Sequence, residues 1–334
     1  MTNYPTVEIG VPGDRTRVPR IGLGTMGMPA VHGAVDDKES FEVLNHAIDI
    51  GCTLWDSANM YSLGDNEKLL SRVLKKRRNE VFLCTKFGIA TREPAPGETI
   101  GNHADYITGF NGKPKYMRTC INESLERLGV DSIDLYYLHF RDSETPIEET
   151  VAAMAELVKE GKVRYLGLSN CTAEDIRRAY KVHPIAAVEV EYSAWATGIE
   201  TDGVLDTCRE LGIALVAYSP LGHGLLFGQV RTHDGLAEDD WRRTHPCYKE
   251  ESAENNGKFV GALESMARKY NGTPGQIALA WLLAQYDNLL VIPGTKRIKY
   301  LDENFAAGQI NLSSDDLKEL RKLVDNANIR GDRD

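Results

Sequence analysis

Four polar residues that can donate, accept or stabilise a proton stand at or just beyond the ends of short apolar segments. Asp56 closes an apolar segment that begins at Cys52, and Tyr61 follows five positions later. Lys86 and His139 end the next two such segments. If the segments are parallel strands, their carboxyl ends meet at one edge of the sheet and bring the four side chains together. A carboxylate, a phenol, an ammonium and an imidazole at one site would form a proton-transfer centre.

This set of groups suits the protonation of an oxygen on which negative charge develops. A tyrosine phenol is a weak acid, with an ordinary pKa of about 10, and a nearby ammonium makes it a better proton donor. Lys86 can supply that charge, Asp56 can hold Lys86 as an ion pair, and His139 can hydrogen-bond an oxygen in the same pocket. This is the general-acid half of a carbonyl reduction. The other half needs a hydride that no side chain provides, and therefore a nicotinamide cofactor.

Each of the four residues also has a purely structural explanation. Asp56 could cap the helix that follows it, and Tyr61 could pack within a loop. Lys86 could be a solvated strand end, and His139 could be a hydrogen-bonded core histidine. Their shared position at strand ends is what favours the catalytic interpretation.

Alternating strand-like and helix-like segments would position these residues. After a predicted hairpin around Pro12 and Gly13, the predicted strands cover residues 21–24, 52–56, 81–86, 133–139, 163–168, 186–190, 214–218 and 289–292. The predicted helices cover residues 38–50, 65–76, 115–128, 146–160, 172–181, 204–211, 258–270, 274–284 and 299–307. Glycines such as Gly51 and Gly129 follow several helices directly before a strand, where helices commonly end. The alternation predicts an α/β fold with a parallel sheet.

Such an alternation allows either a closed barrel or an open nucleotide-binding sheet. Residues Gly22 to Gly27 have the glycine spacing of the open, doubly wound type, but no helix follows them directly. Eight strand–helix units in a chain of 334 residues agree better with a (β/α)8 TIM barrel, preceded by an N-terminal β-hairpin. We therefore expect a single barrel domain over residues 1–334, with the active site at the C-terminal ends of the strands.

Two long segments interrupt the alternation on the face where barrel active sites lie. Residues 87–114 follow the third strand and are rich in glycine and proline. Residues 219–256 follow the seventh strand and combine glycines with an acidic, aromatic stretch. Long loops at the C-terminal face often carry functional residues.

Composition and termini limit the classes of partner. The formal net charge is −10, which repels phosphodiester backbones, so we expect no nucleic-acid partner. The six cysteines are scattered without histidines at ligand spacing, which fits a reducing compartment and predicts no metal site. The N-terminus lacks a signal-peptide pattern, and no segment is long and apolar enough to span a membrane. We expect a cytoplasmic monomer or weak homo-oligomer with no membrane partner.

The segment 51–61, with Lys86 and His139 ending the next two strands, resembles the aldo-keto reductases. The likeness extends from residue 21 to about residue 307. Within that family the chain most resembles fungal reductases of the pyridoxal-reductase type, through residues 186–193 and 217–221.

The resemblance implies the NADPH-dependent reduction of an aldehyde or ketone to the alcohol. In such an enzyme Tyr61 is the general acid and receives support from Lys86 and Asp56. His139 orients the carbonyl group. Hydride comes from C4 of the nicotinamide, and the carbonyl compound is the small-molecule partner.

The same resemblance implies which residues hold NADPH. Ser169 and Asn170 match the pair that hydrogen-bonds the nicotinamide carboxamide, and Tyr218 matches the aromatic residue that stacks on the ring. The loop after Tyr218 would meet the pyrophosphate through backbone N–H groups. The implied set is Gly24, Thr25, Met26, Ser169, Asn170, Glu189, Tyr218, Ser219, Leu221, Gly222, Gly224, Pro293, Gly294, Thr295, Lys296, Arg297, Glu303 and Asn304. The cationic group of Lys296, Arg297 and Lys299, near the position implied for the 2′-phosphate, favours NADPH over NADH.

Two positions depart from the pattern of many relatives. Glu189 stands where many of them have Gln, and a carboxylate can accept but not donate a hydrogen bond. If Glu189 is ionised it favours the positively charged oxidised cofactor, so Glu189→Gln should weaken NADP⁺ binding more than NADPH binding. Tyr300 stands where many members have a phosphate-binding arginine, so Lys296 or Arg297 must compensate.

The expected substrate pocket lies beside Tyr61. Its predicted walls are Met28, Phe87, Phe140, Trp195 and His223. Aromatic and thioether walls accept flat or apolar carbonyl compounds, and His223 adds one polar contact. Pyridoxal, aromatic aldehydes and small ketones all satisfy this description.

A regulatory protein is the alternative from another functional class. Some relatives with this barrel bind NADPH but act chiefly as channel-associated subunits with little turnover, so the fold alone does not establish catalysis. No segment here resembles an added N-terminal inactivation segment, and no His-x-His pattern marks a metal-dependent barrel hydrolase. The enzyme is therefore the favoured hypothesis.

Overall fold

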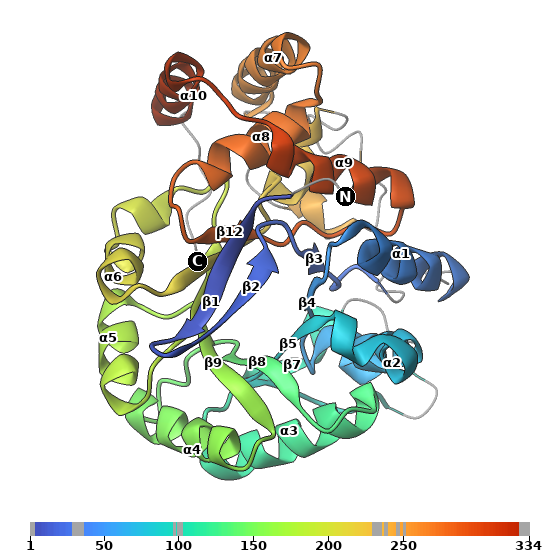
Figure 1. Ribbon diagram of the computed structural model, residues 1–334, viewed down its shortest axis with the longest axis vertical. Helices are drawn as coiled ribbons and strands as arrows, with labels where there is room; N and C mark the ends of the chain where they lie inside the picture. The colour runs from blue at the N-terminus through green and yellow to red at the C-terminus, as the bar shows by residue number, and fades with distance from the viewer. Residues whose placement is uncertain are drawn as a thin grey trace.

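One closed parallel sheet carries the predicted catalytic residues. The computed structural model describes residues 4–28, 37–95, 98, 103–228, 236, 240–244, 248–249 and 252–326. The eight strands follow the order β12-β11-β10-β9-β8-β5-β4-β3, and every neighbouring pair is parallel. Bridges from Ile21 to Val291 and from Gly24 to Gly294 join the first strand to the last. The sheet thus closes with helices around it (Figure 1), which confirms the predicted barrel and excludes the open, doubly wound sheet.

The observed elements begin and end close to the predicted limits. The barrel strands are β3 (Leu23–Gly24), β4 (Leu54–Asp56), β5 (Phe82–Phe87), β8 (Ile133–Leu138), β9 (Val163–Ser169), β10 (Ala187–Glu191), β11 (Ala214–Tyr218) and β12 (Leu289–Val291). The helices are α1 (Asp37–Ile50), α2 (Asp65–Arg77), α3 (Pro114–Leu128), α4 (Ile147–Lys159), α5 (Ala173–Val182), α6 (Val204–Leu211), α7 (Ala253–Lys269), α8 (Pro274–Leu283), α9 (Ile298–Ala306) and α10 (Ser314–Asn326). Every predicted strand and helix has a counterpart, whereas α10 was not predicted.

The glycine-rich segment 22–27 serves the closure of the barrel. A Cβ atom on Gly24 would lie 2.6 Å from the carbonyl oxygen of Ile292, closer than real Cβ contacts come. Only glycine lets the first and last strands approach this closely. This requirement explains the glycine at position 24 without a nucleotide-binding fingerprint.

The N-terminal hairpin covers one end of the barrel. Its strands β1 (Thr6–Val11) and β2 (Asp14–Pro19) pair antiparallel, as predicted. Val7, Ile9 and Val18 belong to the same buried cluster as barrel residues that include Leu54, Phe82, Leu135, Tyr165 and Leu290. That end of the barrel is therefore filled with apolar side chains, and a site can form only at the opposite end.

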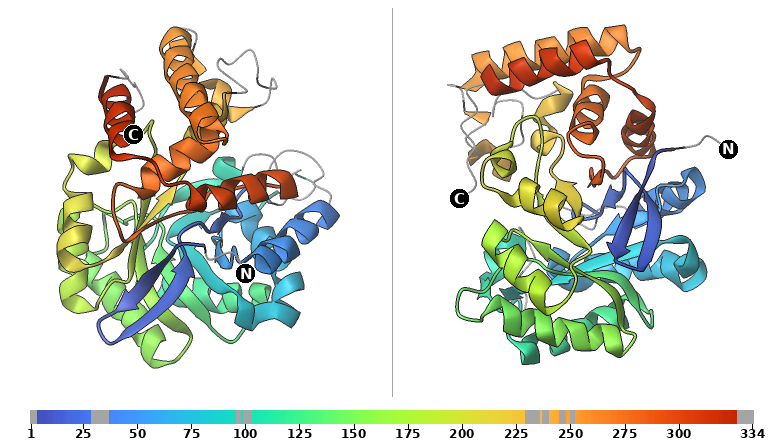
Figure 2. Two further views of the ribbon diagram at one scale, coloured as in Figure 1. Left: turned by 45° about the horizontal axis from the view of Figure 1, so that its top comes forward. Right: turned by 60° about the vertical axis from the view of Figure 1, so that its left-hand side comes forward.

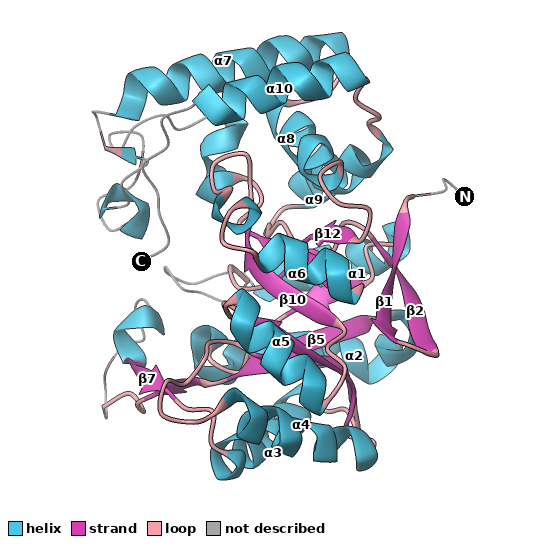
Figure 3. Ribbon diagram, turned by 90° about the vertical axis from the view of Figure 1, so that its left-hand side faces the viewer, coloured by secondary structure: helices cyan, strands magenta, loops and turns pink. Residues whose placement is uncertain are grey.

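A second hairpin lies at the opposite end and was not predicted. Its strands β6 (Ile89–Thr91) and β7 (Ile107–Phe110) pair antiparallel within the long segment 87–114. Figure 3 shows β7 and the β1–β2 hairpin at opposite ends of the barrel strands. The β6–β7 hairpin consequently borders the C-terminal face, where the active site was expected.

Helices α7 and α10 lie side by side away from the barrel strands (Figures 1 and 2). The Lys269 ammonium, at the end of α7, pairs with the Asp316 carboxylate of α10 at 2.7 Å. Arg321 of α10 donates to both Glu200 carboxylate oxygens at 2.8 Å and to the Gln285 side chain at 2.9 Å. Ion pairs and hydrogen bonds therefore fix the C-terminal helix to the rest of the protein. In the described part of the chain, no helix is both long and apolar enough to cross a membrane.

Candidate active site

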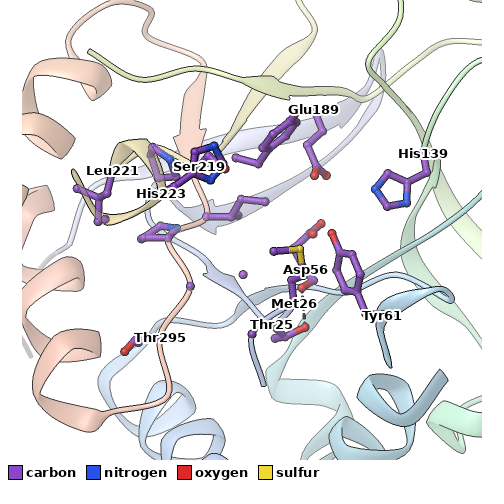
Figure 4. A pocket seen from close by; sticks show the side chains of 18 of the residues that line it. Thr25, Met26, Asp56, Tyr61, His139, Glu189, Ser219, Leu221, His223 and Thr295 are labelled. Atoms are coloured by element: carbon purple, nitrogen blue, oxygen red, sulfur yellow. Dashed lines mark hydrogen bonds between the residues drawn. The ribbon is translucent and has the colours of Figure 1, made fainter. Parts of the chain in front are cut away.

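A cavity of about 650 Å³ opens at the C-terminal ends of the strands. Asp56, Tyr61, His139 and Glu189 line it, and Figure 4 shows these side chains directed into one space. Lys86 lies beneath them and is fully buried. The structure therefore brings together all four predicted catalytic residues and adds Glu189 to their immediate surroundings.

Lys86 is the centre of the hydrogen-bonded group. Its ammonium donates to the Asp56 carboxylate and, at 3.0 Å, to the backbone carbonyl oxygen of Ser57. A Glu189 carboxyl oxygen lies 3.3 Å from the same nitrogen. The ammonium also lies 5.4 Å from the centroid of the Tyr61 ring. Lys86 is thus held between two carboxyl groups and next to the proposed proton donor.

Tyr61 and His139 lie side by side in the cavity wall. Their ring centroids are 5.9 Å apart and the ring planes meet at 82°, an edge-to-face contact. Because both rings border the cavity, a carbonyl oxygen bound there can meet the phenol and the imidazole together. This arrangement agrees with the roles that the resemblance implied for the two residues.

The pKa values in the site follow from burial and from these contacts. Burial alone would lower the pKa of Lys86, but the Asp56 and Glu189 carboxyl groups outweigh it and raise the pKa well above the ordinary value. Burial raises the pKa of Tyr61, and Lys86 only partly offsets this increase. The charge of Lys86 favours the phenolate, as expected, and so reduces the cost of ionising a deeply buried phenol.

Glu189 differs from Lys86 in its protonation. Burial, followed by the charge of Asp56, raises the pKa of Glu189 well above the ordinary value of a carboxyl group. A raised pKa favours the neutral form of this carboxyl group, which can donate a hydrogen bond, over the carboxylate considered in the sequence analysis.

A polar network missed by the sequence analysis positions the loop that carries Tyr61. The side-chain oxygen of Asn66 accepts from the Ser57 hydroxyl at 2.6 Å and lies 2.9 Å from the Thr25 hydroxyl. The Asn66 amide nitrogen donates to the Thr25 carbonyl oxygen at 2.7 Å. These bonds tie the start of α2 to the loops after β3 and β4. Asn66 is fully buried, but its sequence position, one residue inside a helix, gives no sign of this role.

Most residues of the implied cofactor set border the cavity. These are Gly24, Thr25, Met26, Asn170, Glu189, Tyr218, Ser219, Leu221, Gly224, Pro293, Gly294, Thr295 and Lys296. The Tyr218 hydroxyl donates to the Asn170 side-chain oxygen at 3.0 Å, which fixes the orientation of the Tyr218 ring. The five that do not line this cavity are Ser169, Gly222, Arg297, Glu303 and Asn304.

Two of those five residues have their side chains engaged elsewhere. Ser169 is fully buried, and its hydroxyl accepts a hydrogen bond from the Asn170 amide nitrogen at 3.0 Å, which helps to orient the Asn170 side chain. The Glu303 carboxylate accepts from the Thr273 hydroxyl at 2.6 Å. In this structure Ser169 and Glu303 are therefore linked to neighbouring side chains and do not border the cavity.

Of the predicted substrate walls, Phe140 and His223 line the cavity, whereas Met28, Phe87 and Trp195 do not. Side chains alternate along a strand, so the inward direction of Lys86 turns Phe87 outward, where it stacks on Tyr136 at 5.1 Å. Trp195 packs against Phe259 at 4.9 Å, and Met28 is buried in the hydrophobic core. The structure removes these three residues from the pocket wall.

Other residues take their place in the wall. Met60, Ile89, Ile107, Phe227 and Arg242 also line the cavity. Ile89 and Ile107 belong to the unpredicted β6–β7 hairpin, and Arg242 lies within the long segment 219–256. The length of these two segments signalled a function on this face, but sequence alone did not say which side chains would reach the cavity. Among the described residues, no group of three or more His, Cys, Asp or Glu side chains is placed to hold a metal ion.

Comparisons with known proteins agree with this geometry. The aldo/keto reductase family profile matches residues 20–325. The chain is 45% identical to the aldo-keto reductase yakc of Schizosaccharomyces pombe, whose name includes NADP(+), over 99% of this chain and 94% of that protein. The protein therefore belongs to the aldo/keto reductase family, as the resemblance predicted.

Solved structures agree on the fold. A glycerol dehydrogenase from Gluconobacter oxydans superimposes with a TM-score of 0.87 at 24% identity and covers 98% of this chain and 97% of that chain. An aldo-keto reductase from Klebsiella pneumoniae in complex with NADPH superimposes with a TM-score of 0.71 at 28% identity and covers 95% of each chain. The predicted fold and the predicted class of oxidoreductase are both confirmed.

Proposed function

We propose that the protein reduces an aldehyde or ketone to the alcohol, with NADPH as hydride donor and Tyr61 as proton donor. The observation that carries the proposal is the convergence of Tyr61, His139 and the Lys86–Asp56 pair at one end of a single cavity. Tyr61 protonates the carbonyl oxygen, and His139 holds that oxygen by a hydrogen bond. Lys86 stabilises the phenolate that remains on Tyr61.

The rest of the cavity fits a dinucleotide phosphate. Ser219, Leu221 and Gly224 border one side, and Gly294, Thr295 and Lys296 border another. Gly224 has a positive φ of 100°, and its N–H donates to the Leu221 carbonyl oxygen, so this loop makes a tight turn that brings its backbone close to the cavity. Lys296 supplies positive charge beside the cavity, in a protein whose formal net charge is −10. When bound, NADPH supplies the hydride, and the NADP(+) in the name of the fungal relative supports this choice of cofactor.

Aromatic aldehydes, including pyridoxal, are the proposed substrate class. Met60, Ile89, Ile107 and Phe140 provide an apolar wall beside Tyr61. His223 and Arg242 add polar contacts to the cavity, and each also lies beside a carboxylate, Glu191 at 3.2 Å and Asp240 at 2.6 Å. We further propose that the protein works in a reducing compartment such as the cytoplasm, since Cys52, Cys84, Cys120, Cys171 and Cys208 are free and buried.

The test is a steady-state NADPH-oxidation assay over pyridoxal, substituted benzaldehydes and small ketones, repeated with NADH. We expect turnover with NADPH and a loss of about 10²–10⁴-fold in kcat for Tyr61→Phe, because the phenol is the proton donor. Unchanged reduction by Tyr61→Phe would refute the mechanism. Tight NADPH binding without turnover of any carbonyl compound would favour the regulatory-subunit alternative.

A further inference from the structure

Two carboxyl groups share one ammonium at the floor of the cavity. The Asp56 and Glu189 side chains are each 3% exposed, and Lys86 between them is 0% exposed. The second oxygens of both carboxyl groups, Asp56 Oδ2 and Glu189 Oε2, are buried and have no hydrogen-bond partner. Two buried carboxylates beside one ammonium would leave a negative charge uncompensated, at a large cost in free energy. One of the two groups must therefore hold a proton.

Glu189 is the group that holds the proton. Asp56 is in direct contact with the ammonium, whereas Glu189 is 3.3 Å away. The closer partner gains more from being ionised. Burial raises the pKa of both carboxyl groups, but Lys86 is the strongest opposing influence at Asp56, whereas the charge of Asp56 raises the pKa of Glu189 further, which agrees with this assignment.

The other titratable groups around Glu189 hold their protons in the resting protein. Tyr61, Tyr137 and Cys84 all have pKa values that burial raises above their ordinary values, so they keep their protons near neutral pH. Lys86 keeps its proton because its pKa is also raised. His139 and His223 line the same cavity and are titratable residues that an experiment must control.

We propose that Glu189 carries a proton whose occupancy follows the redox state of the cofactor: it stays on Glu189 with NADPH bound and leaves when NADP⁺ binds. The inference rests on the proposed function, because hydride and proton must reach adjacent atoms of one carbonyl group. The nicotinamide ring must therefore lie beside Tyr61, and Glu189 borders the same cavity. An oxidised ring carries one positive charge, which favours an ionised carboxylate close to it.

Charge and protons balance over one reduction. Tyr61 gives its proton to the carbonyl oxygen and is left as a phenolate. Lys86 passes a proton to Tyr61, and Glu189 passes its proton to Lys86 across the 3.3 Å contact. Glu189 ends as a carboxylate, so the negative charge gained there offsets the positive charge of the oxidised ring. Glu189 regains a proton from solvent after NADP⁺ leaves.

The proposal fixes the sign of a pH dependence. NADP⁺ binding releases a proton, so NADP⁺ affinity rises with pH by about tenfold per unit while Glu189 is protonated in the free protein. The affinity for NADPH lacks this dependence on pH, because NADPH binding leaves the proton on Glu189. In Glu189→Gln the NADP⁺ affinity also loses this pH dependence. The variant should therefore bind NADP⁺ more weakly than the native protein, as expected from the sequence, and the difference should be largest at high pH.

Titration calorimetry tests the proposal on the intact protein. NADP⁺ and NADPH are each titrated at pH 7 to 8 in phosphate and in Tris, whose ionisation enthalpies differ, to count released protons. The 2′-phosphate, with a second pKa of about 6, is common to both cofactors, so the readout is the difference between them. We expect NADP⁺ to release about one more proton than NADPH from the native protein, and no difference from Glu189→Gln.

Two matched variants locate the proton. Glu191→Gln makes the same change two residues along β10, where the carboxylate lies 3.2 Å from His223 instead of near Lys86. His139→Gln removes the imidazole next to Tyr61. Both variants should still release about one more proton on binding NADP⁺ than on binding NADPH. Equal proton counts for NADP⁺ and NADPH in the native protein, or an unchanged difference in Glu189→Gln, would overturn the proposal, while failure to bind either cofactor would instead overturn the proposed function.

Discussion

At the scale of single residues, the four catalytic positions were predictable because each combines a reactive side chain with the end of an apolar segment. Strand ends in a parallel α/β fold converge at one face, so type and position together predicted the cluster. Phe87 shows the limit of such reasoning. It follows Lys86 directly and therefore points to the opposite side of β5, a consequence of strand alternation that the substrate prediction did not apply.

Glu189 could be recognised from sequence as an unusual residue but not as a neutral acid. Its protonation depends on its distance to Lys86 and on the nearby charge of Asp56, and both are properties of the folded barrel. Residue type predicts a chemical group, whereas the burial and neighbours that determine its charge come from strands far apart in the sequence.

Glu189 should also make the stability of the protein fall with increasing pH. Its pKa is raised in the folded state above the unfolded value, so it contributes stability below the unfolded pKa that is lost as pH rises toward the folded pKa. The loss is about 1.4 kcal/mol per pH unit while the group is protonated in the folded state and ionised in the unfolded state. Urea unfolding of the native protein and Glu189→Gln at pH 5, 6, 7 and 8 should show a free-energy difference that changes steadily in favour of the variant. A difference independent of pH would contradict a protonated Glu189.

At the scale of elements, the repeating strand–helix units were predictable, whereas α10 and the β6–β7 hairpin were missed. Helix α10 carries usable signals, since Ser313 accepts from the Asp316 backbone at 3.2 Å and Leu317, Leu320 and Val324 follow at helical spacing. The hairpin has no such signal. Its strands of three and four residues mix apolar and polar side chains and pair across an intervening segment, and this pairing depends on the surrounding barrel.

The β6–β7 hairpin should select for aromatic substrates. Ile107 lines the cavity, and Phe110 of the same strand stacks on the wall residue Phe140 at 5.0 Å. Ile107→Ala removes apolar surface from the substrate side, so kcat/KM for benzaldehydes should fall by about tenfold while that for small ketones changes little. Val182→Ala is the matched control, because Val182 is an exposed apolar residue of α5 that does not line the cavity. An equal loss for aromatic and small substrates would exclude a selective role for the hairpin.

Helix α10 should contribute stability without contributing to catalysis. Arg321 joins it to Glu200 and Gln285 and lies 4.9 Å from the centroid of the Trp281 ring. Arg321→Ala removes charge-assisted hydrogen bonds worth about 1–3 kcal/mol, and none of these residues lines the active-site cavity. Urea unfolding should show this decrease in the free energy of unfolding. A steady-state assay of the same variant should show an unchanged kcat. Lys318→Ala, which alters an exposed pair with Asp315 on the same helix, should have almost no effect.

At the scale of the whole molecule, closure of the barrel determines where the cofactor can act. The β1–β2 hairpin and the apolar side chains it contacts close one end of the barrel, so the cavity lies at the other end. Loops that follow both the first and the last strand border this cavity. Strand order and strand ends were enough to predict this face from the sequence. The single domain over residues 1–334 and the assembly state stay predictions, because both depend on surfaces rather than on the order of elements.

A cofactor that contacts loops after both the first and the last barrel strand should stabilise the whole fold, and its 2′-phosphate should act through Lys296. Lys296 lines the cavity, whereas Arg297, Lys299 and Tyr300 do not, so Lys296 is the cation placed to compensate for the missing arginine at position 300. A ligand at 100 times its Kd stabilises the folded state by about 2.7 kcal/mol. Lys296→Met should weaken NADPH binding by roughly tenfold or more, because it removes a charge-assisted contact with the 2′-phosphate. The Kd of NADH, which lacks the 2′-phosphate, should change little.

Thermal unfolding with each cofactor tests this prediction. The increase in Tm caused by NADPH should be smaller in Lys296→Met than in the native protein, and the increase caused by NADH should be unaltered. Lys299→Met, a change of the same type in the first turn of α9, should retain the NADPH shift, and a similar loss in both variants would mean that general positive charge, rather than Lys296, selects NADPH.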